Sequence, residues 1–542
     1  MSASLLVVFV AAKIAVLWGR AGPMTLWSPA AYFWQDVLAA TVFAVVEFIL
    51  PRAARPLYWA LAVYAAINIP VGRALATPLT WPMLHAARGP LGDSMLMYAT
   101  VTNGALMAVI LVLAAILPRF TRSRLMPAVA VAAVIAGPIA SARVDTHGLN
   151  RNVITALISL PHVRAAGQLQ AAAVVRRSGG ELLRYRGAAR GFNVVMIALE
   201  STAAQYVSPE VMPNLSRLAE RAMVFENAYA VYPESIKGLF SVICSSRPAI
   251  DTTAESYEEA PCQPLVQVLA SAGFRTGLFH SGRFDYLGME SIVRHRGYQT
   301  LEDAGDIGGN HRSSFGVDEP ATVARILSWI DGGRQPFFVA YLPIAGHHPY
   351  ATPAPGPFPV NTEMDQYRNA LHYGDASLGE LAEALRARGL DRSTVWIIYG
   401  DHGEAFGQHA GNYGHTFFVY EENVHVPLLI VAPGLMDRQE RVRKVVSLVD
   451  AAPTILDLAG IAVPKGYQGR SMLEPVESMA LFFADYSLRI LGLRDGPWKF
   501  MHEIGSGRSR LFNLEQDPNE ACDLAGKERA RVSGYKKLII EF

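Results

Sequence analysis

Side chains that could bind a divalent cation follow several apolar segments in the second half of the chain. The segments VVMIAL, FENAYAVYP, VAYLPIAG and VWIIYG each lead into residues of this kind, which are Glu200, Ser235, His347, His348, Asp401, His402, His409 and His415. Carboxylate, hydroxyl and imidazole groups together suit a divalent cation. Each residue taken alone has a plain structural explanation, such as a turn or a helix cap. The prediction of a metal site therefore depends on the fold bringing them together.

The segments that precede these residues have the pattern of an α/β domain. Short, β-rich apolar runs such as NVVMIAL, QPFFVAYLP, STVWIIYG and VPLLIVAPG alternate with helical segments such as EPATVARILSWID. This alternation predicts a mostly parallel sheet with helices on both faces. Ligands of such sheets bind at the carboxyl ends of the strands, so we expect the polar residues to meet at that edge.

The first 145 residues are far more apolar. Five apolar stretches occur there, at 4–19, 31–50, 57–72, 97–117 and 126–142. Each has about the length that crosses ~30 Å of hydrocarbon. Five such stretches in succession, separated by short polar loops, predict a transmembrane domain rather than buried core helices. The first stretch is followed by further spans and lacks a clear cleavage site, so we expect it to be retained.

Arginines in two of the loops predict the orientation in the membrane. The loop between the second and third spans and the loop between the fourth and fifth spans carry Arg52, Arg55, Arg119, Arg122 and Arg124. The positive-inside rule makes these loops cytoplasmic. The N-terminus is then cytoplasmic, and everything after about residue 142 is extracytoplasmic. Arg73 and Arg88 lie in the loop at 73–96, which this orientation places outside the cytoplasm, so they conflict mildly with the positive-inside rule.

The composition of the chain limits the kinds of partner that it can bind. The 542-residue chain is too long for one ordinary domain, and its net charge of +1 gives no general attraction to nucleic acid. Three cysteines do not make a disulfide framework. Cys244 and Cys262 are near in sequence and on the predicted extracytoplasmic side, so we expect a disulfide between them, with two buried thiols as the alternative.

The motifs resemble those of the sulfatase and alkaline-phosphatase superfamily over about residues 190–525. NVVMIALES looks like the first metal strand, STVWIIYGDHGEAFGQH like the late metal loop, and HHPY like the His-x-Pro-aromatic motif. YEENVHVPLLIVAPG, SLVDAAPTILDLAGI and the tail LFNLEQDPNEACDLA are further matches. Five spans before an external catalytic domain are similar to the layout of the lipoteichoic acid synthases. The resemblance favours that branch or the phosphoethanolamine transferases.

The resemblance implies a domain organisation. A transmembrane domain at 1–142 would lead through an arginine-rich juxtamembrane linker at 143–190 to an alkaline-phosphatase-like catalytic domain at 191–460, with a small α+β subdomain at 461–542. The linker either rests on anionic lipid or is solvated.

The resemblance also implies a metal centre and a nucleophile. Glu200, Asp401 and His402 would bind one divalent ion, with Ser235 as a further ligand. Mn²⁺ is favoured, and Zn²⁺, Mg²⁺ and Ca²⁺ also accept such ligands. A free hydroxyl is a weak nucleophile, and the metal would lower the pKa of Ser235.

Ser235 is expected to remain a serine. Sulfatases carry Cys or Ser followed by x-Pro-Ser-Arg, which is oxidised to formylglycine. The run Cys244-Ser-Ser-Arg247 lacks the spacing of that motif and lies too far along the chain. FENAYAVYPES resembles the family segment that precedes the nucleophile, and this resemblance puts Ser235 in the nucleophile position. Lys237 and Leu239 take the places of the proline and the arginine of the motif.

Four further residues are candidates to bind the substrate. The resemblance implies that His347 and His415 bind the oxygens of the transferred group or protonate the leaving group. His409 is a weaker candidate, since it could equally be a loop histidine bonded to backbone. FRTGLFHSGRFDYLG resembles a sulfatase stretch in which Arg283 replaces a lysine, and a guanidinium there suits phosphate or sulfate.

These observations predict a membrane-anchored, metal-dependent hydrolase or transferase that forms a covalent intermediate on Ser235. Two departures from sulfatases favour phosphate esters over sulfate esters: Glu200-Ser201 replaces a paired Asp-Asp, and Asp285 replaces a histidine. The expected substrate is a membrane lipid or a lipid-linked phosphate ester. The expected location is the bacterial cytoplasmic membrane, with the catalytic domain on the periplasmic side. The alternatives are a sulfuric ester hydrolase and a non-catalytic membrane regulator. We favour an enzyme because every ligand position is filled.

Overall fold

The chain forms two compact units. The computed structural model describes residues 1–20, 22, 24–86, 92–121, 126–157, 176–177, 179–309, 316–334 and 336–540. The first unit, here called the helical unit, comprises residues 1–88, 92–161 and 406–414, and the second, here called the catalytic unit, comprises 89–91, 162–405 and 415–542. Arg88, Arg122, Arg124 and residues 158–175 and 178 of the predicted linker lie outside the described residues.

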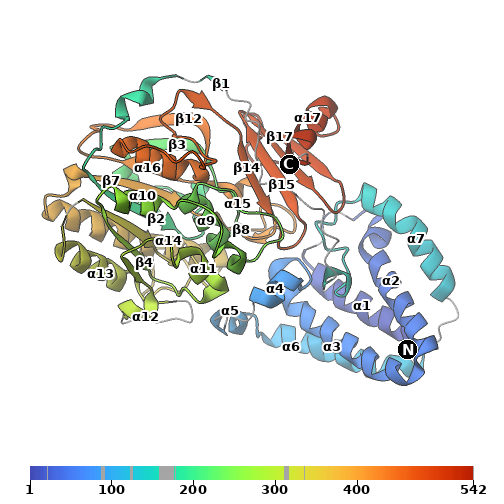
Figure 1. The fold of residues 1–542 in the computed structure, drawn as a ribbon. Coiled ribbons are helices and arrows are strands. Elements are labelled where there is room, and N and C mark those ends of the chain that lie inside the picture. Colours follow the sequence, from blue (N-terminus) through green and yellow to red (C-terminus); the bar gives the residue numbers. More distant parts are fainter. Residues whose placement is uncertain are drawn as a thin grey trace. The chain divides into compact units, whose positions relative to one another are not determined.

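Five long helices of the helical unit cover the five apolar stretches of the sequence (Figure 1). They are α1 (Ser2–Leu17), α2 (Ser28–Ile49), α3 (Pro51–Leu75), α6 (Val101–Ile116) and α7 (Met126–Arg143), and α4 (Trp81–Ala86) and α5 (Gly92–Met97) are short. Judged by length and composition alone, three helical segments in the described part of the chain can cross a membrane: Ser28–Ile49, Val101–Arg119 and Met126–Arg143. The sequence predicts five spans, so two of the five do not reach this criterion.

An ion pair lies inside the helical unit. Lys13 of α1 is paired with Asp36 of α2, and both side chains are buried. The ammonium also donates to the carbonyls of Tyr32 and Asn150, each at 3.0 Å. Asn152 donates to Asp36 at 2.7 Å. The pair ties α1 to α2 and to the loop after α7.

The catalytic unit is built on a nine-stranded sheet (Figure 1). Its strand order is β10 (His425–Val426), β3 (Ala222–Tyr229), β11 (Leu428–Val431), β7 (Thr394–Gly400), β2 (Asn193–Leu199), β6 (Phe337–Leu342), β4 (Arg275–His280) and β5 (Thr300–Glu302), and β12 (Glu440–Ser447) pairs with β3. The strands from β7 to β5 are parallel, as predicted. β11 runs antiparallel to both of its neighbours and β10 runs antiparallel to β3, so the sheet is mixed. The other strands run in one direction, in agreement with the prediction of a mostly parallel sheet.

Both faces of the sheet are covered. One group of helices comprises α8 (Pro213–Ala219), α13 (Glu319–Asp331) and α14 (Glu363–Ala387), and a second group comprises α9 (Ser235–Cys244), α10 (Leu265–Ser271), α11 (Met289–Val293) and α16 (Ala451–Ala459). Val194 and Met196 of β2 belong to the core cluster that includes the second group. Val195 and Ile197 are equally buried but lie outside that cluster, because successive strand residues point to opposite faces.

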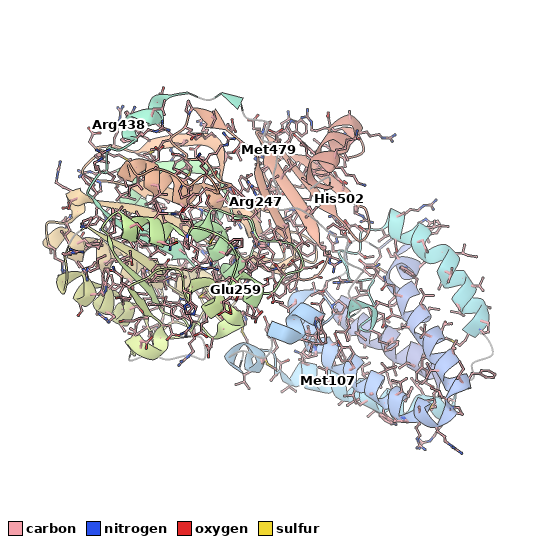
Figure 2. The ribbon with its side chains drawn as sticks, viewed as in Figure 1. Met107, Arg247, Glu259, Arg438, Met479 and His502 are labelled. Atoms are coloured by element: carbon pink, nitrogen blue, oxygen red, sulfur yellow. A yellow bond between two sulfur atoms is a disulfide. The ribbon has the colours of Figure 1, made fainter. Side chains whose placement is uncertain are left out.

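A smaller antiparallel sheet forms the C-terminal subdomain. Its strands are β14 (Ala480–Ala484), β15 (Ile490–Asp495), β16 (Trp498–Glu503) and β17 (Ser509–Asn513), and α17 (Arg529–Ile540) follows them. Met479, just before β14, and His502 of β16 are labelled in Figure 2. The core of this subdomain includes Tyr232, which precedes α9 in the catalytic unit. Phe483 of β14 also donates a backbone hydrogen bond to the carbonyl of Val231 at 3.0 Å.

Candidate active site

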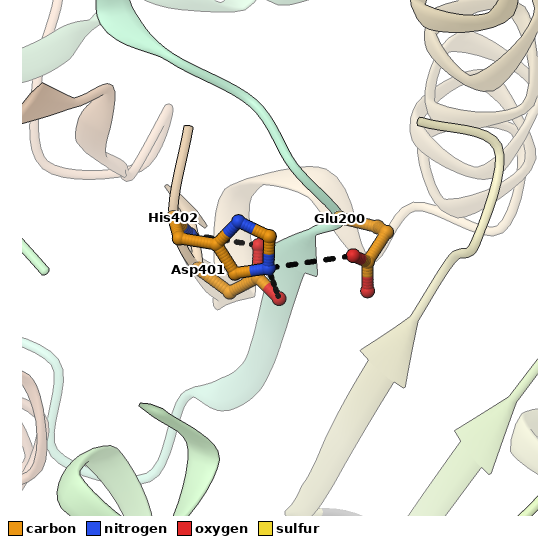
Figure 3. A group of neighbouring side chains, drawn as sticks. All are labelled: Glu200, Asp401 and His402. Carbon is orange, nitrogen blue, oxygen red and sulfur yellow. Dashed lines mark hydrogen bonds and ion pairs between the residues drawn. The ribbon is translucent and has the colours of Figure 1, made fainter. Parts of the chain in front are cut away.

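The register between β2 and β7 positions the first three site residues. The strands are parallel neighbours, and Leu199 pairs with Gly400 at their carboxyl ends. The next residues, Glu200 and Asp401, therefore emerge side by side, followed by His402 (Figure 3). One potential ligand atom of each lies within 4.8 Å of the others, and all three side chains are buried. The structure thus brings together the three residues that the sequence proposes as metal ligands.

Local hydrogen bonds hold these side chains in place. Asp401 accepts the backbone N–H groups of Ser201 at 2.9 Å and of His402 at 2.8 Å, and Ser201 Oγ donates to Glu200 at 3.0 Å. His402 Nδ1 lies 2.9 Å from the carbonyl oxygen of Gly403. Because a carbonyl can only accept, Nδ1 carries a proton, so Nε2 presents a lone pair whenever the ring is in its neutral form. This is the arrangement expected of a histidine that binds a metal.

The electrostatics of the cluster fit a cation. Burial and the charge of Glu200 raise the pKa of Asp401 to about 7. Burial opposes the charged form of His402, but Asp401 and Glu200 outweigh it and raise the pKa of His402 to about 10. Two carboxylates and one imidazole thus share a site removed from water, where a divalent ion would offset their repulsion. The oxygen and nitrogen donors suit Mn²⁺, Zn²⁺, Mg²⁺ or Ca²⁺.

Ser235 lies at the start of α9, directly against this cluster. Its Oγ donates to Glu200 Oε2 at 2.8 Å and lies 3.2 Å from His402 Nε2. Glu234 caps the helix by accepting the N–H groups of Ile236 at 3.0 Å and Lys237 at 3.2 Å. A helix N-terminus favours negative charge, so this position also suits the oxyanion that develops during transfer.

His415 lies beside His402 and is held by a carboxylate that the sequence analysis missed. The centroids of the two imidazole rings are 4.2 Å apart. His415 Nδ1 lies 2.7 Å from Glu404 Oε2, and Glu404 is buried. His415 lowers the pKa of Glu404, although burial alone would raise it. The signal in the sequence was the glutamate two residues after His402, in the run DHGE.

His347 reaches the site through a close backbone approach. A Cβ atom on residue 346 would lie 2.2 Å from the carbonyl oxygen of Glu200, so only glycine lets the chain pass here. His347 Nδ1 lies 2.6 Å from the carbonyl oxygen of His348, and its ring meets that of Tyr286 edge-on at 5.7 Å. Burial lowers the pKa of His347 despite the nearby charge of Glu200. The ring is therefore held neutral near the cluster.

A small pocket beside Ser235 adds a histidine that the sequence analysis also missed. The residues that line this pocket are Ala198, Glu200, Ser235, Leu239, His280, Met289, Leu342, Pro343, Tyr399 and Asp401. His280 ends β4, and its Nδ1 lies 2.9 Å from the carbonyl oxygen of Leu342. Its place at a strand end was a usable signal. Leu239, in the place of the sulfatase arginine, gives the pocket an apolar wall.

The roles of two other candidates stay predictions. Arg283 makes no hydrogen bond or ion pair with Glu200, Ser235, Asp401 or His402 in the part of the chain that the structure describes, and its Nη1 lies 3.8 Å from where a Cβ on residue 305 would be, in α12 (Ala304–Ile307). His409 falls in the segment 406–414, which belongs to the helical unit.

Cys244 is the last residue of α9, at the end of the helix away from Ser235. Cys244 and Cys262 are joined by a disulfide, and Cys522 is a free, exposed thiol. The nucleophile candidate and the disulfide therefore lie at opposite ends of one helix.

Comparison with known proteins identifies the family. The sulfatase family profile matches residues 192–461, and the profile described as N-sulphoglucosamine sulphohydrolase, C-terminal, matches residues 409–536. The chain belongs to the sulfatase and alkaline-phosphatase superfamily. Enzymes of this family depend on a divalent metal ion, and the cluster of Glu200, Asp401 and His402 is a possible site for one.

Curated relatives align with only part of this chain. Arylsulfatase K of Bos taurus is 36% identical over 174 residues, which covers 28% of this chain and 31% of the relative. Arylsulfatase K of Mus musculus is 33% identical over 207 residues, which covers 34% and 36% respectively. The chain thus spans about a third of the length of these relatives.

Solved structures confirm the fold of the catalytic unit. A protein solved in complex with its substrate D-glucosamine-2-N,6-O-disulfate has a TM-score of 0.54 at 16% identity, covering 65% of this chain and 99% of that one. The lipoteichoic acid synthase LtaP of Listeria monocytogenes has a TM-score of 0.51 at 19% identity, covering 66% and 92%. At these identities the likeness is one of fold, and it does not select the lipoteichoic acid synthase branch.

The prediction of an enzyme of this superfamily is confirmed, but the preference for phosphate esters is wrong. The curated relatives are arylsulfatases, which points to sulfate esters. Two physical facts explain the error. Sulfate and phosphate esters both present a tetrahedral oxyanion, so replacing Asp-Asp by Glu200-Ser201 does not discriminate between them. Asp285, the second argument, is exposed and not among the residues that line the pocket beside Ser235.

Proposed function

We propose that this protein is a metal-dependent sulfate ester hydrolase whose nucleophile is the unmodified hydroxyl of Ser235. The observation that carries the proposal is the hydrogen bond from Ser235 Oγ to Glu200 within the buried cluster, in a chain with arylsulfatase relatives. Lys237 and Leu239, where the modification motif has proline and arginine, support an unmodified serine.

Glu200, Asp401 and His402 would bind one divalent ion, with Ser235 Oγ in the same group. When bound, the ion would lower the pKa of the serine hydroxyl and offset negative charge on the sulfate group. We propose Mn²⁺, and the donor set also accepts Zn²⁺, Mg²⁺ or Ca²⁺.

The side chains have separate tasks in the proposed reaction. Ser235 Oγ, whose hydrogen bond to Glu200 positions it, loses its proton to solvent and bonds to sulfur while the bond between sulfur and the ester oxygen breaks. The departing alkoxide takes a proton from an imidazole, for which His415, held by Glu404, is the candidate. Water then gives a proton to the same imidazole and attacks the sulfur of the sulfoserine. The bond between Oγ and sulfur breaks, Oγ regains a proton from solvent, and sulfate leaves with the serine restored.

We propose a sulfated saccharide as the substrate class. One structural neighbour was solved with a sulfated glucosamine as its substrate, and another is described as a 2-O GAG sulfatase. The lipid-linked phosphate ester expected from the sequence is not retained.

We further propose that the helical unit anchors the enzyme in a bacterial cytoplasmic membrane, with the catalytic unit on the outer side. Three helices long and apolar enough to span, together with the arginine-bearing loops, support this arrangement. The resemblance to the layout of the lipoteichoic acid synthases supports this membrane topology. It does not support phosphate ester chemistry.

Turnover of a sulfate ester tests the reaction. Detergent-purified protein with Mn²⁺ should hydrolyse p-nitrophenyl sulfate faster than bis(p-nitrophenyl) phosphate, and chelation should stop the reaction until Mn²⁺ is restored. Ser235→Ala should lower kcat on the order of 10³-fold or more. Rapid quenching and intact-mass analysis should find one SO₃ group on Ser235 of the wild-type protein.

Ser201→Ala is the matched control, since it removes another buried hydroxyl that donates to Glu200. Its kcat should change far less than that of Ser235→Ala. Wild-type turnover by Ser235→Ala would refute the nucleophile, and cleavage of the phosphodiester alone would refute the substrate class. A protein that binds no divalent ion and cleaves neither ester would be a non-catalytic regulator instead.

A further inference from the structure

The first turn of α9 is tied to the C-terminal subdomain by a buried ion pair. Lys237, two residues after Ser235, lies with its Nζ 3.2 and 3.1 Å from the two carboxylate oxygens of Asp485. Asp485 directly follows β14, and both side chains are buried. A contact from outside the main sheet therefore reaches the helix turn that carries the proposed nucleophile.

Asp485 joins this turn to two other segments around α9. It accepts the hydroxyl of Tyr232, which precedes the helix, and the backbone N–H of Asp251 at 2.7 Å, which follows it. Lys237 Nζ also lies 4.6 Å from the centroid of the Tyr232 ring. One carboxylate thus fixes the chain before the helix, its first turn and the loop after it.

We propose that the Lys237–Asp485 pair is a positioning device for Ser235, a proposal that rests on the proposed function. Burying two charges costs desolvation energy that their attraction often fails to recover, so stability alone is a weak reason for such a pair. A geometric role fits better. Lys237 and Ser235 share one helical turn, so a shift of the ammonium shifts the hydroxyl. Lys237 also stands where the modification motif has proline.

The expected effect is on kcat. A displacement of about 1 Å at a reacting group can cost on the order of 10²-fold in rate. Lys237→Met, which keeps the length of the side chain, should lower kcat roughly 10- to 100-fold with KM little changed. Lys237→Arg should recover most of the loss. The double variant Lys237→Met/Asp485→Asn should be no worse than the poorer single variant, because the two residues act as one unit.

Lys499→Met is the matched control. Lys499 of β16 is a buried lysine of the same subdomain, paired with Glu421 at 2.9 Å and Glu520 at 3.0 Å. Its loss should lower thermal stability and leave kcat per folded molecule unchanged.

Two further measurements do not depend on ester turnover. Mn²⁺ titration should show several-fold weaker binding for Lys237→Met than for Lys499→Met, because Ser235 is displaced from the donor set. Hydrogen exchange should be faster at the N–H groups of Ile236 and Lys237, which the helix cap protects. If the wild-type protein cleaves no sulfate ester, the proposed function fails while these readouts still test the positioning role.

The proposal is overturned if Lys237→Met keeps wild-type kcat, Mn²⁺ affinity and exchange. It is also overturned if Lys499→Met causes the same losses, since the effect would then be general destabilisation. If Lys237→Met fails to fold, Asp485→Asn and Lys237→Arg provide the same comparison.

Discussion

At the scale of single residues, four histidines around the site share one arrangement. His280, His347, His402 and His415 each place Nδ1 within hydrogen-bond distance of an oxygen, three of them a backbone carbonyl and the last the carboxylate of Glu404. A carbonyl or carboxylate oxygen accepts, so the proton of each neutral ring lies on Nδ1. Nε2 is then the atom with a lone pair for a metal or a substrate proton. Backbone geometry thereby sets the chemistry of side chains whose sequence positions are far apart.

Glu404 is expected to act through His415. Glu404→Ala should lower kcat roughly 10- to 100-fold, the range seen when an orienting partner of a site histidine is lost. Glu404→Gln keeps an acceptor for Nδ1 and should retain more activity, which a purely structural role would not predict. Steady-state kinetics on both variants check this expectation.

A buried carboxylate away from the site serves as the control for Glu404. Asp375 accepts the backbone N–H groups of Asn214 and Leu215, each at 2.8 Å. Asp375→Asn should reduce stability while leaving kcat of the folded protein near the wild-type value. Equal activity of Glu404→Ala and the wild-type protein would contradict the role assigned to Glu404.

At the scale of elements, the sequence identifies the strands better than their arrangement. The apolar runs ending at Leu199 and Gly400 predict buried strands, and the acidic residues after them mark the carboxyl edge. That β2 and β7 are neighbours depends on packing between distant segments, which no local pattern encodes. The direction of β11 is equally hidden, since a fully apolar strand has the same pattern in either direction. The role of Arg283 in substrate binding stays a prediction.

Gly346→Ala tests the close approach between the loop after β6 and the end of β2. The added Cβ would lie 2.2 Å from the carbonyl oxygen of Glu200, so the backbone must move. We expect a loss of about 1–3 kcal/mol in the free energy of unfolding. Mn²⁺ affinity should fall as well, because Glu200 moves with its carbonyl. Denaturant unfolding and metal titration measure the two effects.

Gly534→Ala in α17 is the comparison for Gly346→Ala. No atom lies within 4 Å of its would-be Cβ, so alanine should be neutral or slightly stabilising there through its helix propensity. A Gly346→Ala variant as stable as Gly534→Ala would show that the loop does not constrain the end of β2.

At the scale of the whole molecule, the five apolar stretches become five long helices, yet only α2, α6 and α7 belong to segments with the length and composition of a span. The reasons can be read in the other two. α1 has only 16 residues, and α3 contains Arg52, Arg55 and Arg73. The sequence also could not predict every segment of the helical unit. Residues 406–414 belong to this unit, although in the sequence they lie between segments of the catalytic unit. Sequence order alone gives no sign of such a contact.

Thiol labelling can decide the membrane orientation, because the wild-type protein offers one natural reporter. Cys244 and Cys262 are bonded, and Cys522 of the catalytic unit is free and exposed. A membrane-impermeant maleimide should label the protein in intact spheroplasts, and Cys522→Ser should abolish the signal. In the Cys522→Ser background, Leu26→Cys should be labelled in intact cells and Phe120→Cys only after lysis. Both positions are exposed, and the arginine-bearing loops place them on opposite sides of the membrane. Labelling of Cys522 only after lysis would put the catalytic unit in the cytoplasm. The positive-inside assignment would then be wrong, and an extracytoplasmic sulfated saccharide could no longer be the substrate.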